Sequence, residues 1–103
     1  MIKAALMLTT VALLAPACAA AQQPRDKLVS LVRQDCGSCH GLTLKGGLGP
    51  SLLPQALAGK DADALAAIIL NGVPETPMPP WKGELSPDDA LWIATRLKEG
   101  FPR

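Results

Sequence analysis

The stretch Cys36-Gly37-Ser38-Cys39-His40 decides the fold of this 103-residue chain. Two cysteines separated by two residues and followed directly by a histidine form the attachment pattern of a c-type haem. Each thiol must reach one vinyl group on the same edge of the porphyrin, and the histidine must then lie under the iron as its proximal ligand. The motif therefore predicts a redox protein with one covalent haem, bound by Cys36 and Cys39 and ligated by His40.

The cysteine pair has two other interpretations. A structural zinc site needs four ligands, and the chain offers only one histidine, His40, and one further cysteine, Cys18. A thioredoxin-like dithiol lies at a helix N-terminus after a strand, whereas this motif follows an expected helix and no βαβ pattern surrounds it. The haem-free dithiol redox protein is kept as the alternative from a different functional class.

The first 21 residues have the features of a secretory signal peptide. Lys3 supplies the positive start, residues 4–15 carry no charge but are too few to span a bilayer, and Ala19-Ala20-Ala21 offers a small-residue cleavage site. We therefore expect cleavage after Ala21 and a periplasmic domain of residues 22–103 without a membrane span. Leu14-Ala15-Pro16-Ala17-Cys18 loosely resembles a lipoprotein signal, and we favour a discarded Cys18 over a lipidated one.

Charge in the expected domain is balanced but unevenly distributed. Residues 22–103 carry nine basic and nine acidic side chains, which gives no indication of nucleic-acid binding. Residues 25–60 hold five bases and two acids, whereas residues 61–89 hold one base and six acids. Ordinary solvated faces are the favoured interpretation, with a dipolar surface that orients a redox partner as the alternative. A domain this small usually needs additional stabilisation, which a covalent haem would supply.

Apolar periodicity predicts an all-α domain with three main helices and two long loops. We expect helices over about 24–35, 62–70 and 87–99, and proline- and glycine-rich loops over 41–59 and 73–85. The first helix has an apolar face of Leu28, Leu31 and Val32. The second is apolar almost all round and is expected to be buried.

Helix ends have recognisable signals. Asp61 or Asp63 is expected to cap the second helix, which ends at Asn71-Gly72. In the third helix Ser86 is the expected N-cap, Pro87 the first residue, and Asp89 completes a capping box. Its expected buried stripe consists of Ala90, Ile93, Ala94 and Leu97.

Met78 is the expected second axial ligand. It is the only methionine in residues 22–103, and His40, the only histidine, is already used. Prolines around Met78 stiffen its loop, so less entropy is lost when the weak thioether–iron bond forms. With both axial positions filled, substrate cannot reach the iron, which favours an electron carrier over an enzyme; His/Met ligation also raises the potential.

The sequence resembles class I cytochrome c throughout residues 22–103. The resemblance rests on the cysteine–histidine motif, on Gly49-Pro50, on Met78-Pro79 and on the C-terminal helix. It implies the class I fold, one haem c, and a carbonyl of Pro50 that accepts a hydrogen bond from the proximal histidine ring. The segments 41–52 and 77–81 with Leu85-Ser86 are similar to small NirC-type cytochromes c, which are encoded with the haem-containing nitrite reductase of denitrifying bacteria.

That second resemblance implies partners. The chain would carry single electrons to nitrite reductase in denitrification, or would act as an electron acceptor while a maturation enzyme completes that reductase's second haem. The sequence leaves both roles open. Glu75 stands where such loops more usually have glycine. Trp81 and Trp92 are candidates to pack on the haem edge, and the expected haem-wall residues are Leu48, Leu52, Leu53, Ile68 and Ile69.

Overall fold

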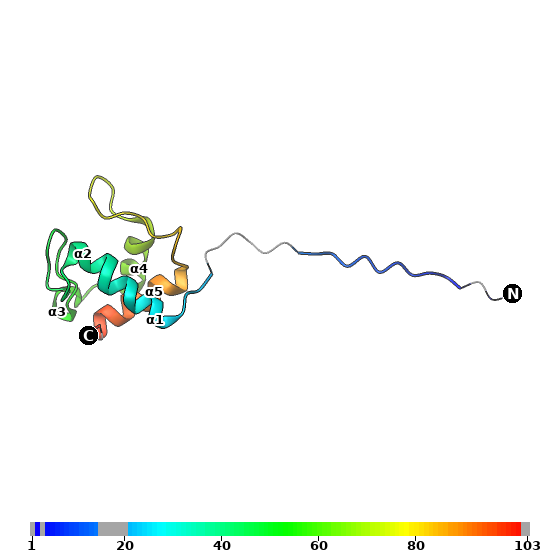
Figure 1. The fold of residues 1–103 in the computed structure, drawn as a ribbon, viewed down its shortest axis with the longest axis horizontal. Coiled ribbons are helices and arrows are strands. Elements are labelled where there is room, and N and C mark those ends of the chain that lie inside the picture. The colour runs from blue at the N-terminus through cyan, green and yellow to red at the C-terminus, as the bar shows by residue number, and fades with distance from the viewer. Residues whose placement is uncertain (1, 3, 15–20, 102–103) are drawn as a thin grey trace.

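A continuous helical segment from Arg25 to His40 carries the cysteine–histidine motif at its C-terminal end (Figure 1). The computed structural model describes residues 2, 4–14 and 21–101, in which there are helices and loops but no strand. The segment consists of α1 (Arg25–Leu31), a π-helical turn η1 (Val32–Cys36) and α2 (Gly37–His40). The expectation that the first helix ends near residue 35 is wrong, because the π-helical turn continues the helix through His40.

Three further helices complete the fold. They are α3 (Pro54–Leu57), α4 (Ala62–Asn71) and α5 (Pro87–Glu99). The bounds of α4 and α5 confirm the two helices expected there, and the all-α class is confirmed. The four-residue helix α3 was not expected, because proline at its first position is the only local signal. In Figure 1 the loop after α2 lies at the end of the helical body opposite the N-terminal segment, and the loop after α4 projects from the top of the body.

The start of α5 is fixed by the expected capping box. The backbone N–H of Asp89 donates to the Ser86 hydroxyl at 3.0 Å, and the backbone N–H of Ser86 donates to Asp89 Oδ2 at 3.1 Å. Asp89 is completely buried. Its side-chain oxygen Oδ1 also accepts from the backbone N–H of Gln23 at 3.1 Å, so one buried side chain joins the N-terminal residues of the domain to α5.

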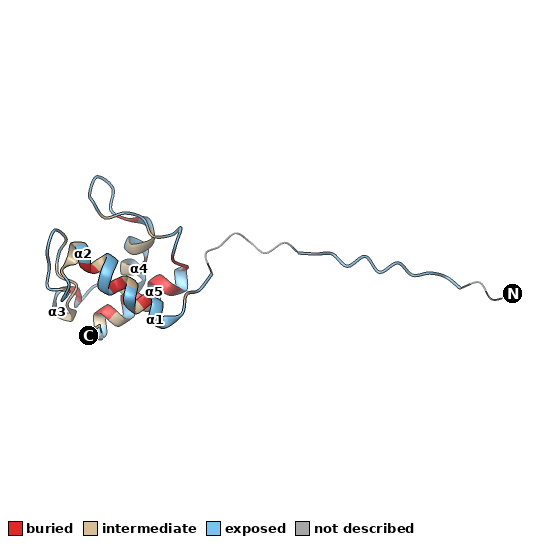
Figure 2. Cartoon of the chain, in the orientation of Figure 1, coloured by how far each residue is buried: buried red, intermediate tan, exposed pale blue. Residues whose placement is uncertain are grey.

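The core lies where α1 and η1 meet α5 (Figure 2). Leu28 and Val32 are completely buried, as the expected face of the first helix requires. The stripe expected on α5 is confirmed, since all four of its members are buried. Ala90 and Ala94 of α5 pack with Ala66 of α4, and these small side chains let the two helices approach closely. The buried leucines Leu57 and Leu85 complete the core.

Helix α4 differs from the expectation. It is not buried all round: Ala66 is its only buried residue among those described, and Ile68 is 44% exposed. Its many apolar side chains therefore face both the protein core and open surface. Asp61 occupies the N-cap position, but its side chain makes no capping hydrogen bond. The C-terminal end is as expected, since Gly72 follows Asn71 with a φ of 67°.

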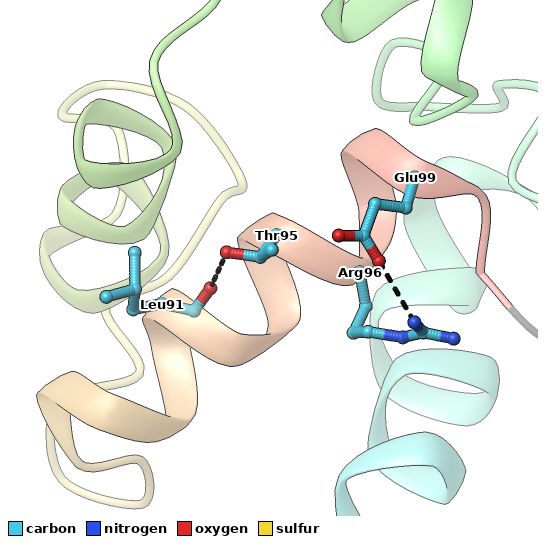
Figure 3. Close-up of polar contacts among 4 residues, drawn as sticks. All are labelled: Leu91, Thr95, Arg96 and Glu99. Carbon is cyan, nitrogen blue, oxygen red and sulfur yellow. Dashed lines mark hydrogen bonds and ion pairs between the residues drawn. The ribbon is translucent and has the colours of Figure 1, made fainter.

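The outer face of α5 carries its own local contacts. The hydroxyl of Thr95 donates to the carbonyl of Leu91 at 2.8 Å, and Arg96 pairs with Glu99 at 3.0 Å (Figure 3). Trp92 packs edge-to-face on Phe101, with ring centroids 6.3 Å apart, and the Arg25 guanidinium lies 4.8 Å from the Trp92 ring centroid. Trp92 thus packs between the start of α1 and the residue Phe101 that follows α5.

The described N-terminal residues 4–14 form no helix and are exposed. Lys3, Cys18 and the alanines at 19 and 20, on which the signal-peptide interpretation depends, lie outside the described residues. Among the residues that are described, no helix combines the length and the apolar character needed to cross a bilayer.

Candidate haem-binding site

The π-helical turn sets the direction in which the motif faces. In an uninterrupted α-helix, twelve residues of separation would turn His40 about 120° away from Leu28, at 3.6 residues per turn. A π-helical turn accommodates one additional residue, which reduces that angle to about 20°. The end of α2 is therefore brought back towards the helix face whose residues Leu28 and Val32 are buried in the core.

The two thiols lie one turn apart at this helix end. Cys36 and Cys39 are both free and half-buried. Burial raises the pKa of the Cys36 thiol from 9.0 to about 11, and the nearby Asp35 carboxylate and Cys39 add to the rise. A catalytic dithiol needs the opposite shift, since the thiolate is the nucleophile. The position at a helix C-terminus and this raised pKa both argue against the dithiol alternative.

The His40 ring is oriented by the loop that follows it. Its Nδ1 lies 2.7 Å from the carbonyl oxygen of Pro50, and because a carbonyl can only accept, Nδ1–H is the donor. The Nε2 lone pair is then the ring's free ligating position. Gly49 lies directly against the ring, since a Cβ added there would be 2.8 Å from the His40 atoms Cε1 and Nδ1.

Residues 41–52 fold back on the end of α2 through backbone hydrogen bonds. Gly49 N–H donates to the carbonyl of Cys39 and Gly46 N–H to that of His40, each at 2.8 Å. These bonds satisfy carbonyl groups that a helix end leaves without partners. Leu44 has a φ of 61°, which is unusual for a residue with a side chain, and its carbonyl accepts from Leu52 N–H at 2.9 Å. The loop is thus held at several points.

Gly49→Ala is expected to weaken the site. The new methyl group must displace either the His40 ring or the backbone that carries Pro50, and such overpacking typically costs about 1–3 kcal/mol. The free energy of unfolding of the haem-loaded protein should fall by that amount in a denaturant titration. Gly83→Ala is the matched control: a Cβ there would meet nothing within 4 Å, so its effect should stay within about 0.5 kcal/mol. Equal stabilities for both variants would contradict the close contact.

Met78 lies half-buried in the loop after α4. Its carbonyl accepts from Val73 N–H at 3.2 Å, and its N–H donates to the Thr76 hydroxyl at 3.3 Å. Gly72 allows this close turn, since a Cβ at that position would lie 2.7 Å from the Met78 carbonyl oxygen. Beyond the loop, Trp81 N–H donates to the carbonyl of Ile69 at 3.1 Å, which fixes the loop to α4.

The available donors fit a haem better than a bare metal ion. No group of three or more His, Cys, Asp or Glu side chains able to hold a metal is present in the part of the chain that the structure describes. The candidate donors are two thiols, one imidazole and one thioether. Exposed apolar side chains, with Leu42 79% and Leu48 77% exposed, provide surface that a flat apolar group can cover. Leu52, Leu53 and Ile69 are half-buried, as side chains beside such a group would be.

Some residues of the site had no clear sequence signal. The left-handed conformation of Leu44 and the hydroxyl contacts of Thr76 depend on how each loop closes. Glu75 did have a sequence signal, because glycine is more usual at that loop position. The structure explains the preference for glycine, since the φ of Glu75 is 65°. Gly49 was identified only as part of Gly49-Pro50, and its contact with the His40 ring emerged from the structure.

The helical fold and the motif at the end of α2 define a c-type cytochrome. Residues 23–95 match a family model described as cytochrome c oxidase, cbb3-type, subunit III. Over 74 residues the chain is 61% identical to cytochrome c55X of Pseudomonas aeruginosa. The aligned region is 72% of this chain and 62% of that protein. Among solved structures, a c-type cytochrome NirC is 58% identical, with a TM-score of 0.73 and coverage of 75% of this chain and 91% of that one.

A second solved structure belongs to a much longer protein, and only a small part of that protein is similar to this chain. It is the dihydro-heme d1 dehydrogenase NirN in complex with DHE, with 36% identity and a TM-score of 0.64. The similar region is 72% of this chain but 16% of that one. The chain therefore belongs to the cytochrome c family. It is an electron carrier with covalently bound haem c and the class I all-α fold.

Proposed function

We propose that residues 22–103 form a periplasmic carrier of single electrons that delivers them to nitrite reductase, after removal of residues 1–21 as a signal peptide. In this proposal Cys36 and Cys39 bind the haem through thioether bonds, and His40 Nε2 and the Met78 thioether ligate the iron. Haem c supplies an iron that takes up and releases one electron. The Nδ1–Pro50 hydrogen bond is the observation that supports the arrangement, because it orients the ring and commits Nε2 to the ligand role.

The protein's own residues would limit the chemistry to electron transfer. If His40 and Met78 both hold the iron, no position on it would remain for a substrate, so we propose that the chain is not an enzyme. Ligation by a thioether favours the reduced iron and raises the potential. Contacts between redox partners are small and weak, which suits a carrier that must dissociate after each transfer.

Charge on the surface would orient the encounter with the partner. The five basic side chains of residues 25–60 are exposed, as are five of the six acids of residues 61–89. The sixth, Asp89, is buried in the capping box and contributes nothing to the surface. The two segments therefore present opposite charges to solvent, with no large net charge to accelerate association overall.

A second role is favoured by one specific observation. A region of a dihydro-heme d1 dehydrogenase is similar to this chain at 36% identity. A cytochrome-like region is suited to take up electrons that a dehydrogenase removes from its substrate, and a separate cytochrome could take them up in the same way. The alternative proposal is therefore that this chain receives electrons during maturation of the second haem of nitrite reductase.

Stopped-flow measurements distinguish the two roles. The reduced protein is mixed with oxidised nitrite reductase, and the oxidised protein with the dehydrogenase and its reduced substrate, across a salt series. Fast transfer to nitrite reductase that slows mildly with salt supports the carrier role, since charges more than about 8 Å apart are screened at physiological ionic strength. Transfer only from the dehydrogenase supports the maturation role, and slow exchange with both proteins refutes both.

A further inference from the structure

The Thr76 hydroxyl is the centre of the hydrogen bonds in the Met78 loop. It donates to the carbonyl oxygen of Val73 at 2.7 Å and accepts from the backbone N–H of Met78 at 3.3 Å. The Met78 carbonyl accepts from Val73 N–H at 3.2 Å. Both backbone polar groups of Met78 are therefore held, and one of the two bonds depends on the Thr76 side chain.

The loop has few other means of holding this conformation. Four of the seven residues from 74 to 80 are prolines, which have no N–H to donate. Glu75 adds a steric cost, because its φ of 65° lies in the left-handed region that disfavours residues with a side chain. The prolines limit the shapes available to the loop, and hydrogen bonds help to select among them. Backbone bonds supply two of these, from Val73 N–H to the Met78 carbonyl and from Thr76 N–H to the Val73 carbonyl, each at 3.2 Å, and the Thr76 hydroxyl supplies two more.

We propose that Thr76 is a positioning residue that stabilises the iron-bound state of Met78; this rests on the proposal above that Met78 is the distal ligand. The thioether–iron bond is weak, so the fraction of molecules with Met78 bound depends on how well the loop is held. Loss of the Thr76 bridge increases the fraction with Met78 released. A competing ligand such as imidazole binds only that released state, so its apparent affinity rises in proportion.

The test uses Thr76→Val in the complete haem-loaded protein, because valine keeps the branched shape and removes the hydroxyl. In the oxidised protein the apparent dissociation constant for imidazole should fall about tenfold, or 1.4 kcal/mol, as expected for loss of one or two solvent-exposed hydrogen bonds. The weak near-infrared band of Met–Fe(III) ligation should decrease, and the reduction potential should fall. Thr76→Ser, which restores the oxygen, should return all three measurements towards the original protein.

Thr95→Val is the matched control. The Thr95 hydroxyl also makes an exposed bond to a backbone carbonyl, that of Leu91, but it lies on α5 (Figure 3). This variant should leave imidazole affinity and the near-infrared band unchanged. If Thr76→Val yields too little haem-loaded protein, Thr76→Ala compared with Thr76→Ser gives the same contrast.

The outcomes distinguish the positioning role of Thr76 from the proposal that Met78 ligates the iron. Suppose that the original protein shows the near-infrared band but Thr76→Val binds imidazole with an affinity within twofold of that of Thr95→Val. The positioning role of Thr76 is then overturned, and Met78 remains the ligand. Absence of the band in the original protein overturns Met78 ligation, and the role of Thr76 with it. The proposal is supported if imidazole affinity changes about tenfold in the variants that lack the Thr76 hydroxyl and stays unchanged in Thr76→Ser and Thr95→Val.

Discussion

Replacing both Cys36 and Cys39 with serine is expected to give a chain that holds no haem after acid–acetone extraction. A hydroxyl does not form the thioether bond to a vinyl group, so haem held only through its iron ligands, His40 and Met78, would be extracted with the solvent. We also expect the variant to lose most of its cooperative unfolding transition by circular dichroism, because a domain of this size has a small core and would lose its largest apolar group.

Ser38→Ala is the control for this experiment. Ser38 lies between the cysteines and its hydroxyl donates to the carbonyl of Asp35 at 2.7 Å, so the change affects the same helix end without removing a thiol. It should keep the haem through extraction. Single cysteine variants should retain it through one thioether. Haem that remains attached to the double variant would show that covalent attachment uses other residues.

Met78→Ala is expected to abolish the near-infrared band of the oxidised protein, lower its potential, and open the iron to cyanide and carbon monoxide. The thioether favours the reduced state, and its loss removes both this preference and the barrier to added ligands. Visible and near-infrared spectra with a redox titration provide the measurement.

Met78→Leu separates ligation from packing. Leucine has nearly the same volume as methionine, so a packing role would be preserved and a ligand role would not. We expect the leucine variant to match the alanine variant in its spectrum and potential while unfolding at a higher denaturant concentration. An unchanged near-infrared band in either variant would rule out Met78 as the ligand.

The features predicted well from the sequence were those encoded by neighbouring residues. Ser86-Pro87 and Asp89 marked the start of α5 to the residue, and the alanine and leucine spacing identified its buried stripe. These signals succeed because capping and amphipathic packing depend on positions only three or four residues apart. The cysteine–histidine motif is local in the same sense, and it correctly identified the family and the cofactor.

Features that depend on distant contacts could not be predicted. The π-helical turn and the bond from Gln23 to Asp89 require knowledge of which segments meet in the folded chain. Helix α4 was expected to be buried because its residues are apolar, yet composition alone does not say whether protein or another apolar body covers them. The hydroxyl of Thr76 has no role that its sequence neighbours reveal.

The extra residue in η1 restricts how the length of this chain can vary. Removing one residue between Leu31 and Cys36 would give a regular α-helix that keeps the motif at about the same angle to Leu28, whereas adding one more α-helical residue there would rotate everything after it by about 100°. The motif would then face a different part of the molecule while α1 kept its place in the core. A residue added or removed in the connection between α3 and α4 would only change a surface turn. An added residue in the helix would therefore redirect the motif, whereas a length change in that turn would not.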